Sequence, residues 1–212
     1  MSKNDSISMS VIRRLPRYYR FLTELDEQGT DRISSTKLAQ IMNVTASQVR
    51  QDLNCFGGFG QQGYGYSVSQ LKIEIEAILG LNNSYKAIII GAGNLGNALA
   101  QHMNFGQLGF ELVGCFDISP EKVGREIRGL RIRHDSELEA FCSENKLDAA
   151  FLCIPKSAVE NVIDVLYRHG IRSYWNFSHF DICSKYSDAV VENVHLSDNL
   201  MTLCYRMNNS LG

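Results

Sequence analysis

The chain has 212 residues and a formal net charge of −2, with 44% hydrophobic and 21% charged residues, a composition typical of one or two globular domains. Its charge balance indicates neither nucleic acid nor a membrane surface as a partner. No apolar run approaches the roughly 20 residues of a membrane helix, and the first ten residues are too polar for a secretory signal. The six cysteines are scattered without a Cys-x-x-Cys pair, so we expect a cytoplasmic protein with reduced thiols.

The first predicted element is a helix over residues 9–28. Its leucines and tyrosines face a core, while Arg13, Arg17 and Arg20 share another face. Pro16 must either kink this helix or lie in its first turn, because proline lacks the amide hydrogen that an interior position donates.

Two short helices joined by a tight turn follow. The stretch "SSTKLAQIM" predicts a helix capped by Ser34 or Ser35, and "NV" predicts the turn. The stretch "TASQVRQDLNCF" begins with Thr45 and Gln48 in the Thr-x-x-Gln spacing of a capping box. This pattern predicts a helix-turn-helix.

The glycine-rich stretch "GGFGQQGYGY" comes next and favours a β-hairpin, which here predicts the wing of a winged helix. The following stretch, "VSQLKIEIEAILG", is capped by Ser67. It carries Leu71, Ile75, Ile78 and Leu79 as an apolar stripe, and we expect this amphipathic helix to lead into the second domain.

Polar side chains in the predicted winged helix are of the types that contact bases or phosphates. The candidate DNA-binding residues are Lys37, Thr45, Ser47, Gln48, Arg50, Gln51, Asn54 and Gln62. Residues 1–66 hold eight Lys and Arg against six Asp and Glu, so charge alone does not decide the partner. A small helical dimerisation or interaction module remains the alternative for this region.

The stretch "KAIIIGAGNLGNALA" predicts a dinucleotide-binding turn. An apolar, β-branched run runs directly into Gly91, Gly93 and Gly96 in the spacing G-x-G-x-x-G. In this motif the first glycine permits a tight turn, the second lets a pyrophosphate approach the backbone, and the third lets helix and strand pack closely. The phosphates would bind the N–H groups at the start of the next helix.

A second predicted strand, "FELVGCFD", ends in Asp117, 21 residues after Gly96. An acidic residue at this distance holds the ribose hydroxyls of NAD, and it disfavours the 2′-phosphate of NADP. Lys122 and Arg125 lie close enough in sequence to keep NADP open as the alternative.

The alternation of strands and helices continues to the end of the chain. "LRIR" predicts a short strand, and Asp135 or Ser136 is expected to cap a helix that runs through Asn145. The buried strand in "DAAFLCIP" ends at Pro155, and the helix in "KSAVENVIDVLYRHG" ends at Gly170. "IRSYWNF" and "AVVENV" predict two further strands.

We therefore predict an α/β protein: an N-terminal winged helix-turn-helix domain over residues 1–80, a Rossmann-type doubly wound parallel sheet over residues 81–196, and a C-terminal helix over residues 197–212. A ligand should bind across the carboxyl ends of the strands. The predicted NAD-binding residues are Gly91, Ala92, Gly93, Asn94, Leu95, Gly96, Asp117, Ile154, Pro155, Asn176 and Phe177.

Five segments, in order, carry a family resemblance: "RLPRYYRFL", "ISSTKLAQIMNVTASQVRQDLNCFGGFGQQGYGY", "GAGNLGNALA", "GFELVGCFDISPEKVGREIRGL" and "NFSHFDI". The chain resembles the Rex family of redox-sensing transcriptional repressors over nearly its whole length. The resemblance implies a homodimer that binds operator DNA upstream of genes for respiration and fermentation, that NADH releases, and that NAD+ permits to bind. It also implies that the last helix, about residues 197–207, is exchanged between subunits and packs near the partner's DNA-binding domain.

The resemblance further implies a switch. In the family a tyrosine near the nicotinamide, an aspartate before the exchanged helix and an arginine on the first helix exchange partners as the ring changes charge. The corresponding residues of this chain are His102, His195 and Arg20.

Several of these positions depart from the family pattern. Gln51 stands where the family usually has lysine, and Gln62 stands where its wing usually has arginine. His102 replaces the tyrosine, His179 replaces the proline of an N-F-A-P motif, and His195 replaces the aspartate of N-V-D-L. A divergent paralogue that binds NAD(H), DNA or both, with weakened redox switching, is therefore the main alternative function.

Two other classes of function compete with a repressor. An NAD-dependent oxidoreductase is less favoured because the chain leaves little room for a substrate domain, and we assign no catalytic residue. An NAD-binding adaptor, whose winged helix meets protein and not DNA, is the other class. The five histidines show no metal-ligand spacing such as H-E-x-x-H, so no metal is predicted.

Overall fold

The computed structural model describes residues 7–57, 59–61 and 64–210. The chain divides into two compact units, Met1–Asn82 and Asn83–Gly212. Each unit has its own buried apolar core. In the described part of the chain, no helix is both long and apolar enough to span a membrane.

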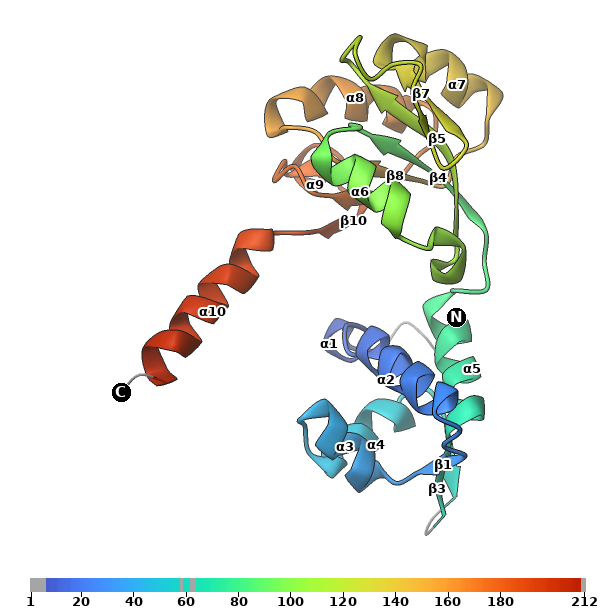
Figure 1. The fold of residues 1–212 in the computed structure, drawn as a ribbon, viewed down its shortest axis with the longest axis vertical. Helices are drawn as coiled ribbons and strands as arrows, with labels where there is room; N and C mark the ends of the chain where they lie inside the picture. The colour runs from blue at the N-terminus through green and yellow to red at the C-terminus, as the bar shows by residue number, and fades with distance from the viewer. Residues whose placement is uncertain (1–6, 58, 62–63, 211–212) are drawn as a thin grey trace. The chain divides into compact units, whose positions relative to one another are not determined.

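The first unit is a helical core joined to a small antiparallel sheet (Figure 1). Its elements are α1 (Met9–Ile12), α2 (Leu15–Glu27), β1 (Arg32–Ile33), α3 (Ser35–Met42), α4 (Ala46–Asn54), β2 (Gly60–Gln61), β3 (Gly65–Ser67) and α5 (Val68–Leu79). The three strands are ordered β1-β3-β2, and both pairings are antiparallel. The predicted helix-turn-helix and hairpin are thus present as α3, α4, β2 and β3.

Local chemistry sets the boundaries of these helices. The hydroxyl of Ser34 accepts a hydrogen bond from Lys37 N at 3.1 Å, and that of Thr45 accepts one from Gln48 N at 3.1 Å. Asn43 makes the turn between α3 and α4 in the left-handed region, at φ 52°, which asparagine tolerates better than most residues. The turn of the predicted helix-turn-helix is therefore built by a residue suited to it.

The single helix predicted over residues 9–28 is wrong in one respect. The structure has two helices there, α1 and α2, and Pro16 lies in the first turn of α2. Proline is favoured at this place because the amide hydrogen that it lacks would have no partner within the helix.

The second unit is a parallel sheet with one antiparallel edge strand. Its strands are β4 (Tyr85–Ile90), β5 (Phe110–Asp117), β6 (Glu126–Ile127), β7 (Leu130–His134), β8 (Ala149–Leu152), β9 (Ser173–Asn176) and β10 (Val190–Asn193). Their order is β10-β9-β8-β4-β5-β7-β6, and only β6 is antiparallel to its neighbour. The chain first builds outward from β4 through β5 to β7, and then returns to build β8, β9 and β10 on the other side. The order therefore reverses between β4 and β8, which is where such sheets bind ligands.

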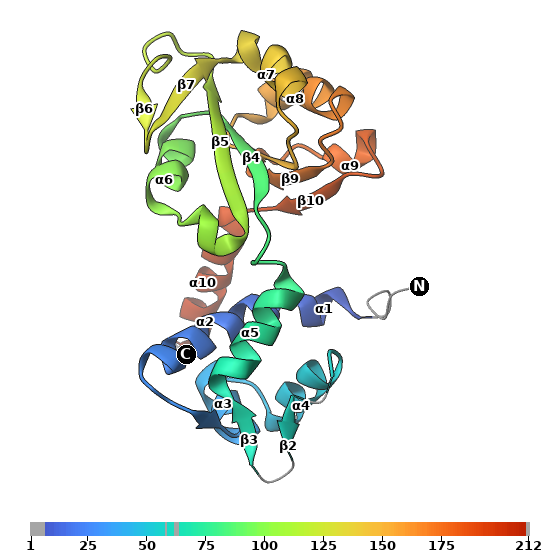
Figure 2. The ribbon, with the colours of Figure 1, turned by 90° about the vertical axis from the view of Figure 1, so that its right-hand side faces the viewer.

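Helices cover both faces of this sheet (Figure 2). The helices of this unit are α6 (Asn94–His102), α7 (Leu138–Glu144), α8 (Lys156–Arg168) and α9 (Ile182–Lys185), with short 3₁₀ helices η2 (Phe105–Leu108) and η3 (Asp135–Glu137). The last helix, α10 (Leu196–Ser210), has exposed side chains and does not cover the sheet. Ile88 and Ile90 pack with α7 and α8, whereas Ala87 and Ile89 pack in the cluster on the α6 side. Alternate residues of β4 thus reach two cores, which explains why its last four residues, 87–90, are all apolar.

Three local details differ from the sequence prediction. The edge strand β6 and the short helix α9 were not predicted. The capping residue after β7 is His134, and neither Asp135 nor Ser136, because the His134 ring accepts from Ser136 N at 3.2 Å. Glu137 completes this cap by accepting from His134 N, and α7 ends at Glu144 with Asn145 as its C-cap.

Candidate functional site

The predicted nucleotide site lies at the carboxyl ends of the central strands. Strand β4 pairs in parallel with β5 and with β8, and β8 pairs in parallel with β9. Parallel pairing brings the residues that follow each strand to the same edge of the sheet. The structure therefore gathers at one edge all the predicted NAD-binding residues, from the glycine turn, Asp117, the Ile154–Pro155 corner and the end of β9.

The three glycines have three different surroundings. Gly91 has φ +98°, and a Cβ there would lie 2.6 Å from the Cys153 carbonyl oxygen. A Cβ on Gly96 would meet the Gly91 carbonyl oxygen, so this glycine lets α6 pack against the turn. A Cβ on Gly93 would meet nothing within 4 Å among the described residues. The middle glycine thus leaves space for a ligand, as a pyrophosphate requires.

The start of α6 suits an anion. Gly93 is the N-cap residue and has no side chain to accept from the first-turn N–H groups, and Asn94 and Leu95 follow it. These N–H groups and the positive end of the helix dipole favour a phosphate. The turn and helix together fit the pyrophosphate of a dinucleotide.

Asp117 is buried, with 6% of its surface exposed. One carboxylate oxygen accepts from Ser119 N at 2.8 Å, and the other accepts from Lys122 Nζ at 3.0 Å. The carboxylate is therefore fixed in orientation at the end of β5. Lys122, one of the two residues that kept NADP open, is already paired with the acid that disfavours a 2′-phosphate.

Asn176 is buried within a hydrogen-bond network that closes the end of β9. Its amide nitrogen donates to the Phe180 carbonyl at 2.9 Å and to Asn193 Oδ1 at 2.7 Å. Its amide oxygen accepts from the backbone N–H and the hydroxyl of Ser178. Because both donors and both acceptor positions are used inside the protein, Asn176 shapes the loop after β9. Phe177 is half-buried beside it and packs edge-on against Trp175, with ring centroids 4.6 Å apart.

The three predicted switch residues lie on different elements. His102 is exposed at the end of α6, and Arg20 is exposed on α2 in the first unit. His195 lies between β10 and α10, and its ring stacks on that of His179 with centroids 4.5 Å apart and an interplanar angle of 22°. Their Nδ1 atoms are 2.5 Å apart. Both residues depart from the family pattern, but nothing in the sequence predicted that they meet.

Six of the eight predicted DNA-binding residues lie on α3 and α4, the two helices of the predicted helix-turn-helix (Figure 1). Most of their side chains reach the surface of the unit, and Arg50 Nη1 donates to Ser35 Oγ at 3.1 Å. The exposed residues of this set are Lys37, Ser47, Arg50, Gln51 and Asn54. Thr45 precedes α4, and its hydroxyl also caps that helix. Gln62 lies outside the described residues.

Gln48 belongs to a network around a buried aspartate that was not predicted from the sequence. Asp52 has 0% of its surface exposed. Its carboxylate accepts from Arg14 Nε and Nη2, both at 2.7 Å, from Gln48 Nε2 at 2.8 Å and from Tyr18 Oη at 3.0 Å. Burial alone raises the pKa of Asp52, but the hydrogen bonds from Arg14, Gln48 and Tyr18 outweigh burial, so the pKa lies below its usual value. Gln48, one turn before Asp52 on the same helix, thus helps to satisfy the buried carboxylate.

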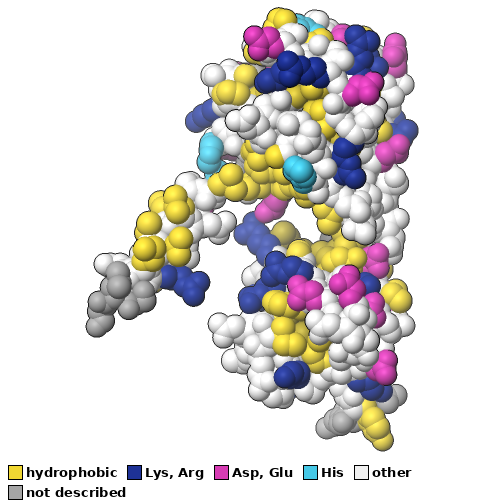
Figure 3. Space-filling model, viewed as in Figure 1, with side chains coloured by type: hydrophobic (Ala, Val, Ile, Leu, Met, Phe, Trp, Pro, Cys, Tyr) yellow, Lys and Arg dark blue, Asp and Glu magenta, His cyan; other side chains and the backbone are white. Residues whose placement is uncertain are grey.

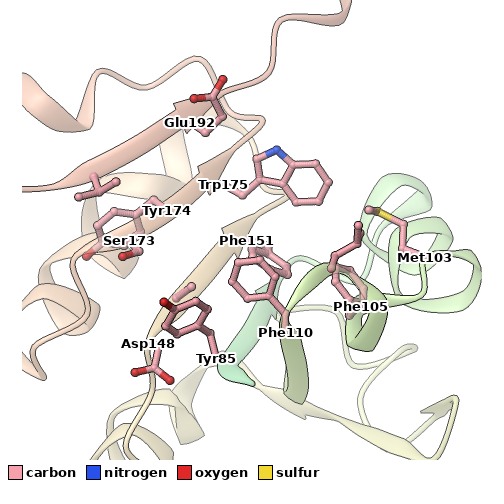
Figure 4. Close-up of a pocket in the computed structure, with 13 residues that line it drawn as sticks. Tyr85, Met103, Phe105, Phe110, Asp148, Phe151, Ser173, Tyr174, Trp175 and Glu192 are labelled. Atoms are coloured by element: carbon pink, nitrogen blue, oxygen red, sulfur yellow. The ribbon is translucent and has the colours of Figure 1, made fainter. Parts of the chain in front are cut away.

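An apolar cavity lies at the opposite edge of the sheet in the second unit, at the amino ends of the strands (Figure 4). It has a volume of about 630 Å³. Tyr85, Phe110, Phe151 and Trp175 line it among other apolar residues from η2, β8 and β10. The predicted NAD-binding residues lie at the carboxyl ends of the strands, so this apolar cavity is separate from the predicted nucleotide site.

Comparison with known proteins agrees with both units. Residues 6–54 match the family model described as "Putative DNA-binding protein N-terminus", and residues 82–180 match the "CoA binding domain" model. The chain is 51% identical over 208 residues to the redox-sensing transcriptional repressor Rex of Thermoanaerobacter pseudethanolicus, and these residues make up 98% of this chain and 92% of that protein. It is 49% identical over 208 residues to Rex of Clostridium novyi, covering 98% and 99%.

Solved structures agree as well. A Rex-family repressor called RSP, crystallised with β-NAD+ and operator DNA, superposes with a TM-score of 0.87 at 50% identity, covering 96% of this chain and 94% of that one. The same repressor with β-NADH gives a TM-score of 0.89 at 47% identity, covering 98% and 97%. With about half of its residues identical to these repressors over nearly its full length, the chain belongs to the Rex family of redox-sensing transcriptional repressors.

Proposed function

We propose that this protein is a DNA-binding transcriptional repressor that senses the NADH/NAD+ ratio in the cytoplasm. The observation that carries the proposal is that one chain holds two sites. The first is the exposed polar face of α4, and the second is the glycine turn with the buried Asp117 beside it. The dinucleotide is then an effector, and the winged helix is the output. The relatives are repressors and not enzymes, so the family argues against an oxidoreductase.

For the nucleotide, the first-turn N–H groups of α6 would hold the pyrophosphate, and Asp117 would hold the adenosine ribose. Gly91 and Gly96 keep the turn tight, and Ala92 is buried between Gly91 and Gly93. Ile154 and Pro155 form the neighbouring corner between β8 and α8. Support comes from the open space at Gly93 and the fixed carboxylate of Asp117. NADH and NAD+ are the effectors, and the carboxylate disfavours their phosphorylated forms.

For DNA, α4 would enter the major groove and present Ser47, Arg50, Gln51 and Asn54 to bases or phosphates. Lys37 on α3 would contact the phosphate backbone, and so would Gln62, which lies outside the described residues. Arg50 is the only lysine or arginine of α4, so most of the charge-dependent affinity of this helix rests on it.

We further propose that the protein is a homodimer in which α10 is exchanged. Hydrophobic side chains gather along α10 (Figure 3), where Leu196, Leu200 and Leu203 have 63%, 62% and 50% of their surface exposed. The apolar cavity at the amino ends of the strands is a second apolar surface in the same unit. A second copy of the chain would cover such surfaces without any other partner, and the family resemblance implies this exchange.

A variant of this function has a specific observation in its favour. The stacked pair of His179 and His195 stands where the family has a proline and an aspartate. A carboxylate near the nicotinamide would favour the cationic oxidised ring over the neutral reduced ring, and histidine does not supply that charge. A repressor with weakened redox switching would have this site.

The direct test is a DNA mobility shift on the gene's own upstream region, with NAD+ and NADH titrated separately. We expect the protein to bind that DNA, and to bind it more weakly with NADH than with NAD+. Binding that neither dinucleotide changes would support the variant with weakened switching. Failure to bind DNA, combined with dinucleotide binding, would support the protein-binding adaptor.

A further inference from the structure

Two histidine rings converge in the second unit, where the loop after β9 meets the residue that precedes α10. His179 is exposed and His195 is half-buried, and their Nδ1 atoms are 2.5 Å apart. A neutral imidazole nitrogen is the metal ligand that proteins use most often. The spacing of the histidines along the chain predicts no metal, but the fold brings these two nitrogens to one point.

A buried amide holds the backbone beside both histidines. The side-chain nitrogen of Asn176 donates to the carbonyl of Phe180, directly after His179, at 2.9 Å. The backbone carbonyl of Asn176 accepts from Val194 N, directly before His195, at 2.9 Å. Both rings are therefore carried on backbone that is fixed without any ligand, as a preorganised binding site requires.

The loop also holds His179 in an unusual conformation. Its φ is 60°, in the left-handed region, which is unfavourable for most residues with a side chain and which histidine adopts more often than most. The neighbouring Ser178 is buried, and its hydroxyl accepts from Phe180 N at 3.2 Å. The surrounding hydrogen bonds thus keep the His179 ring at the surface in a strained conformation, and such strain is concentrated at functional sites.

The two nitrogens suit a particular class of ion. Imidazole suits Zn²⁺, Ni²⁺ and Cu²⁺, whereas Mg²⁺ and Ca²⁺ prefer oxygen ligands. Two nitrogens bound to one such ion at about 2.0–2.1 Å each lie about 2.9–3.4 Å apart. The rings would therefore have to separate by less than about 1 Å, which surface side chains allow. No group of three or more His, Cys, Asp or Glu side chains that could hold a metal occurs in the described part of the chain, so water or another exchangeable ligand would fill the other positions.

We propose that His179 and His195 form a binding site for a divalent transition-metal ion, to which each ring supplies its Nδ1 atom. With the ion bound, neither ring needs to donate a hydrogen to the other, because both nitrogens bind the metal through their lone pairs. His195 directly precedes α10, which follows β10 (Figure 1). A bound ion would therefore tie the start of α10 to the loop after β9. The inference is independent of the proposed binding of NAD(H) and DNA.

The test titrates Ni²⁺ and Zn²⁺ into the full-length, reduced protein, without a histidine tag, by calorimetry at about pH 7.5, where unperturbed imidazole is mostly neutral. We expect each metal to bind at a site that needs both histidines, and Mg²⁺ to give no binding heat. Fluorescence gives a second readout, because Trp175 on β9 is the only tryptophan of the chain and Ni²⁺ bound nearby should quench it.

Two variants make the test specific to the pair. His179→Asn removes the imidazole and keeps a residue that tolerates the left-handed region, and His195→Ala removes the other ring. Each should weaken Ni²⁺ binding at least about tenfold, since even the loss of a group that only orients a metal ligand costs about 10- to 100-fold. Circular dichroism checks that both variants fold.

Other groups that bind metal are controlled in the same experiment. The exposed thiols of Cys55, Cys183 and Cys204 are kept in every variant, so any metal that they bind stays constant. His169→Ala removes a half-buried histidine at the end of α8 and should keep the wild-type affinity.

Three outcomes would overturn the inference. The wild type could bind neither Ni²⁺ nor Zn²⁺, or both variants could bind them as tightly as the wild type does. A loss of affinity in only one of the two variants would also contradict the site, because an ion shared by two rings needs both. The titrations contain no dinucleotide and no DNA, so their result does not depend on whether the proposed function holds.

Discussion

Arg14 and Asp52, which are 38 residues apart in sequence, form a bidentate ion pair with two hydrogen bonds of 2.7 Å. The carboxylate is fully buried, whereas 30% of the arginine side chain is exposed. The pair joins the start of α2 to the inner face of α4. It therefore ties α4, the proposed recognition helix, to the core of the first unit.

Asp52→Ala should destabilise the first unit by about 3 kcal/mol, because it removes one partner of a buried ion pair and leaves Arg14, Gln48 and Tyr18 without their acceptor. Urea unfolding followed by circular dichroism measures the change. The control is Asp26→Ala, which breaks the more exposed 2.7 Å pair with Lys72 and should cost under about 1 kcal/mol. Equal destabilisation in the two variants would show that the Asp52 network adds nothing beyond a surface pair.

The stability that Asp52 contributes should depend on pH in one direction. Its pKa is lower in the folded protein than in the unfolded chain, so its contribution is present above the unfolded value near 4. It disappears as pH falls through the folded pKa. The difference in unfolding free energy between wild type and Asp52→Asn should therefore shrink below about pH 4. A difference that stays constant from about pH 6 to pH 3 would contradict the lowered pKa.

Arg50→Ala should weaken operator binding and lower the slope of log affinity against log salt by about 0.9 for each phosphate that the protein no longer neutralises. Arg50 is exposed on α4 and is the only cation of that helix. Fluorescence anisotropy with labelled operator at several salt concentrations measures both quantities. Arg131→Ala removes an exposed arginine from β7 in the second unit and serves as the control. Wild-type affinity in the Arg50 variant would mean that α4 is not the recognition helix.

Asp117→Asn should narrow the preference for NADH over NADPH. The wild-type carboxylate repels a 2′-phosphate and also holds Lys122 at 3.0 Å. The amide removes that repulsion and releases the lysine to pair with the phosphate. Calorimetry with both ligands checks this, with the exposed Glu121→Gln of the same loop as control. Equal or tighter binding of NADPH by the wild type would refute the assignment of Asp117 to the ribose.

The difference between NADH and NAD+ in their effect on operator affinity should respond to restoration of the family residues. The contact between His179 and His195 needs one ring to donate and the other to accept, so the two rings are engaged with each other and neither supplies a carboxylate.

We expect that difference to be smaller than in typical relatives, and His195→Asp together with His102→Tyr should widen it. Operator affinity at saturating NAD+ and NADH, measured for wild type and the double variant, decides the matter. His169→Gln, at the end of α8, is the control substitution. A large release by NADH in the wild type would show that other residues sense the ring.

The sequence by itself determined the parts whose signals are local. The apolar run before Gly91 predicted a buried parallel strand, because a strand covered on both faces has apolar residues on both sides. The spacing of Gly91, Gly93 and Gly96 directly after that run predicted the turn. Ser34 and Thr45 predicted where α3 and α4 begin, since a capping hydroxyl acts within three residues of its own position.

Only the tertiary structure decided the contacts between distant residues. In the sequence, Asp52 is one of several polar residues of α4. The structure shows that Arg14 and Tyr18, from the start of α2, donate hydrogen bonds to its carboxylate. In the sequence, His179 and His195 are two separate departures from the family pattern. They come into contact only because β9 and β10 pair in parallel and end side by side. Periodicity reports which face of an element is buried, but the partner across that face is set by packing of the whole chain.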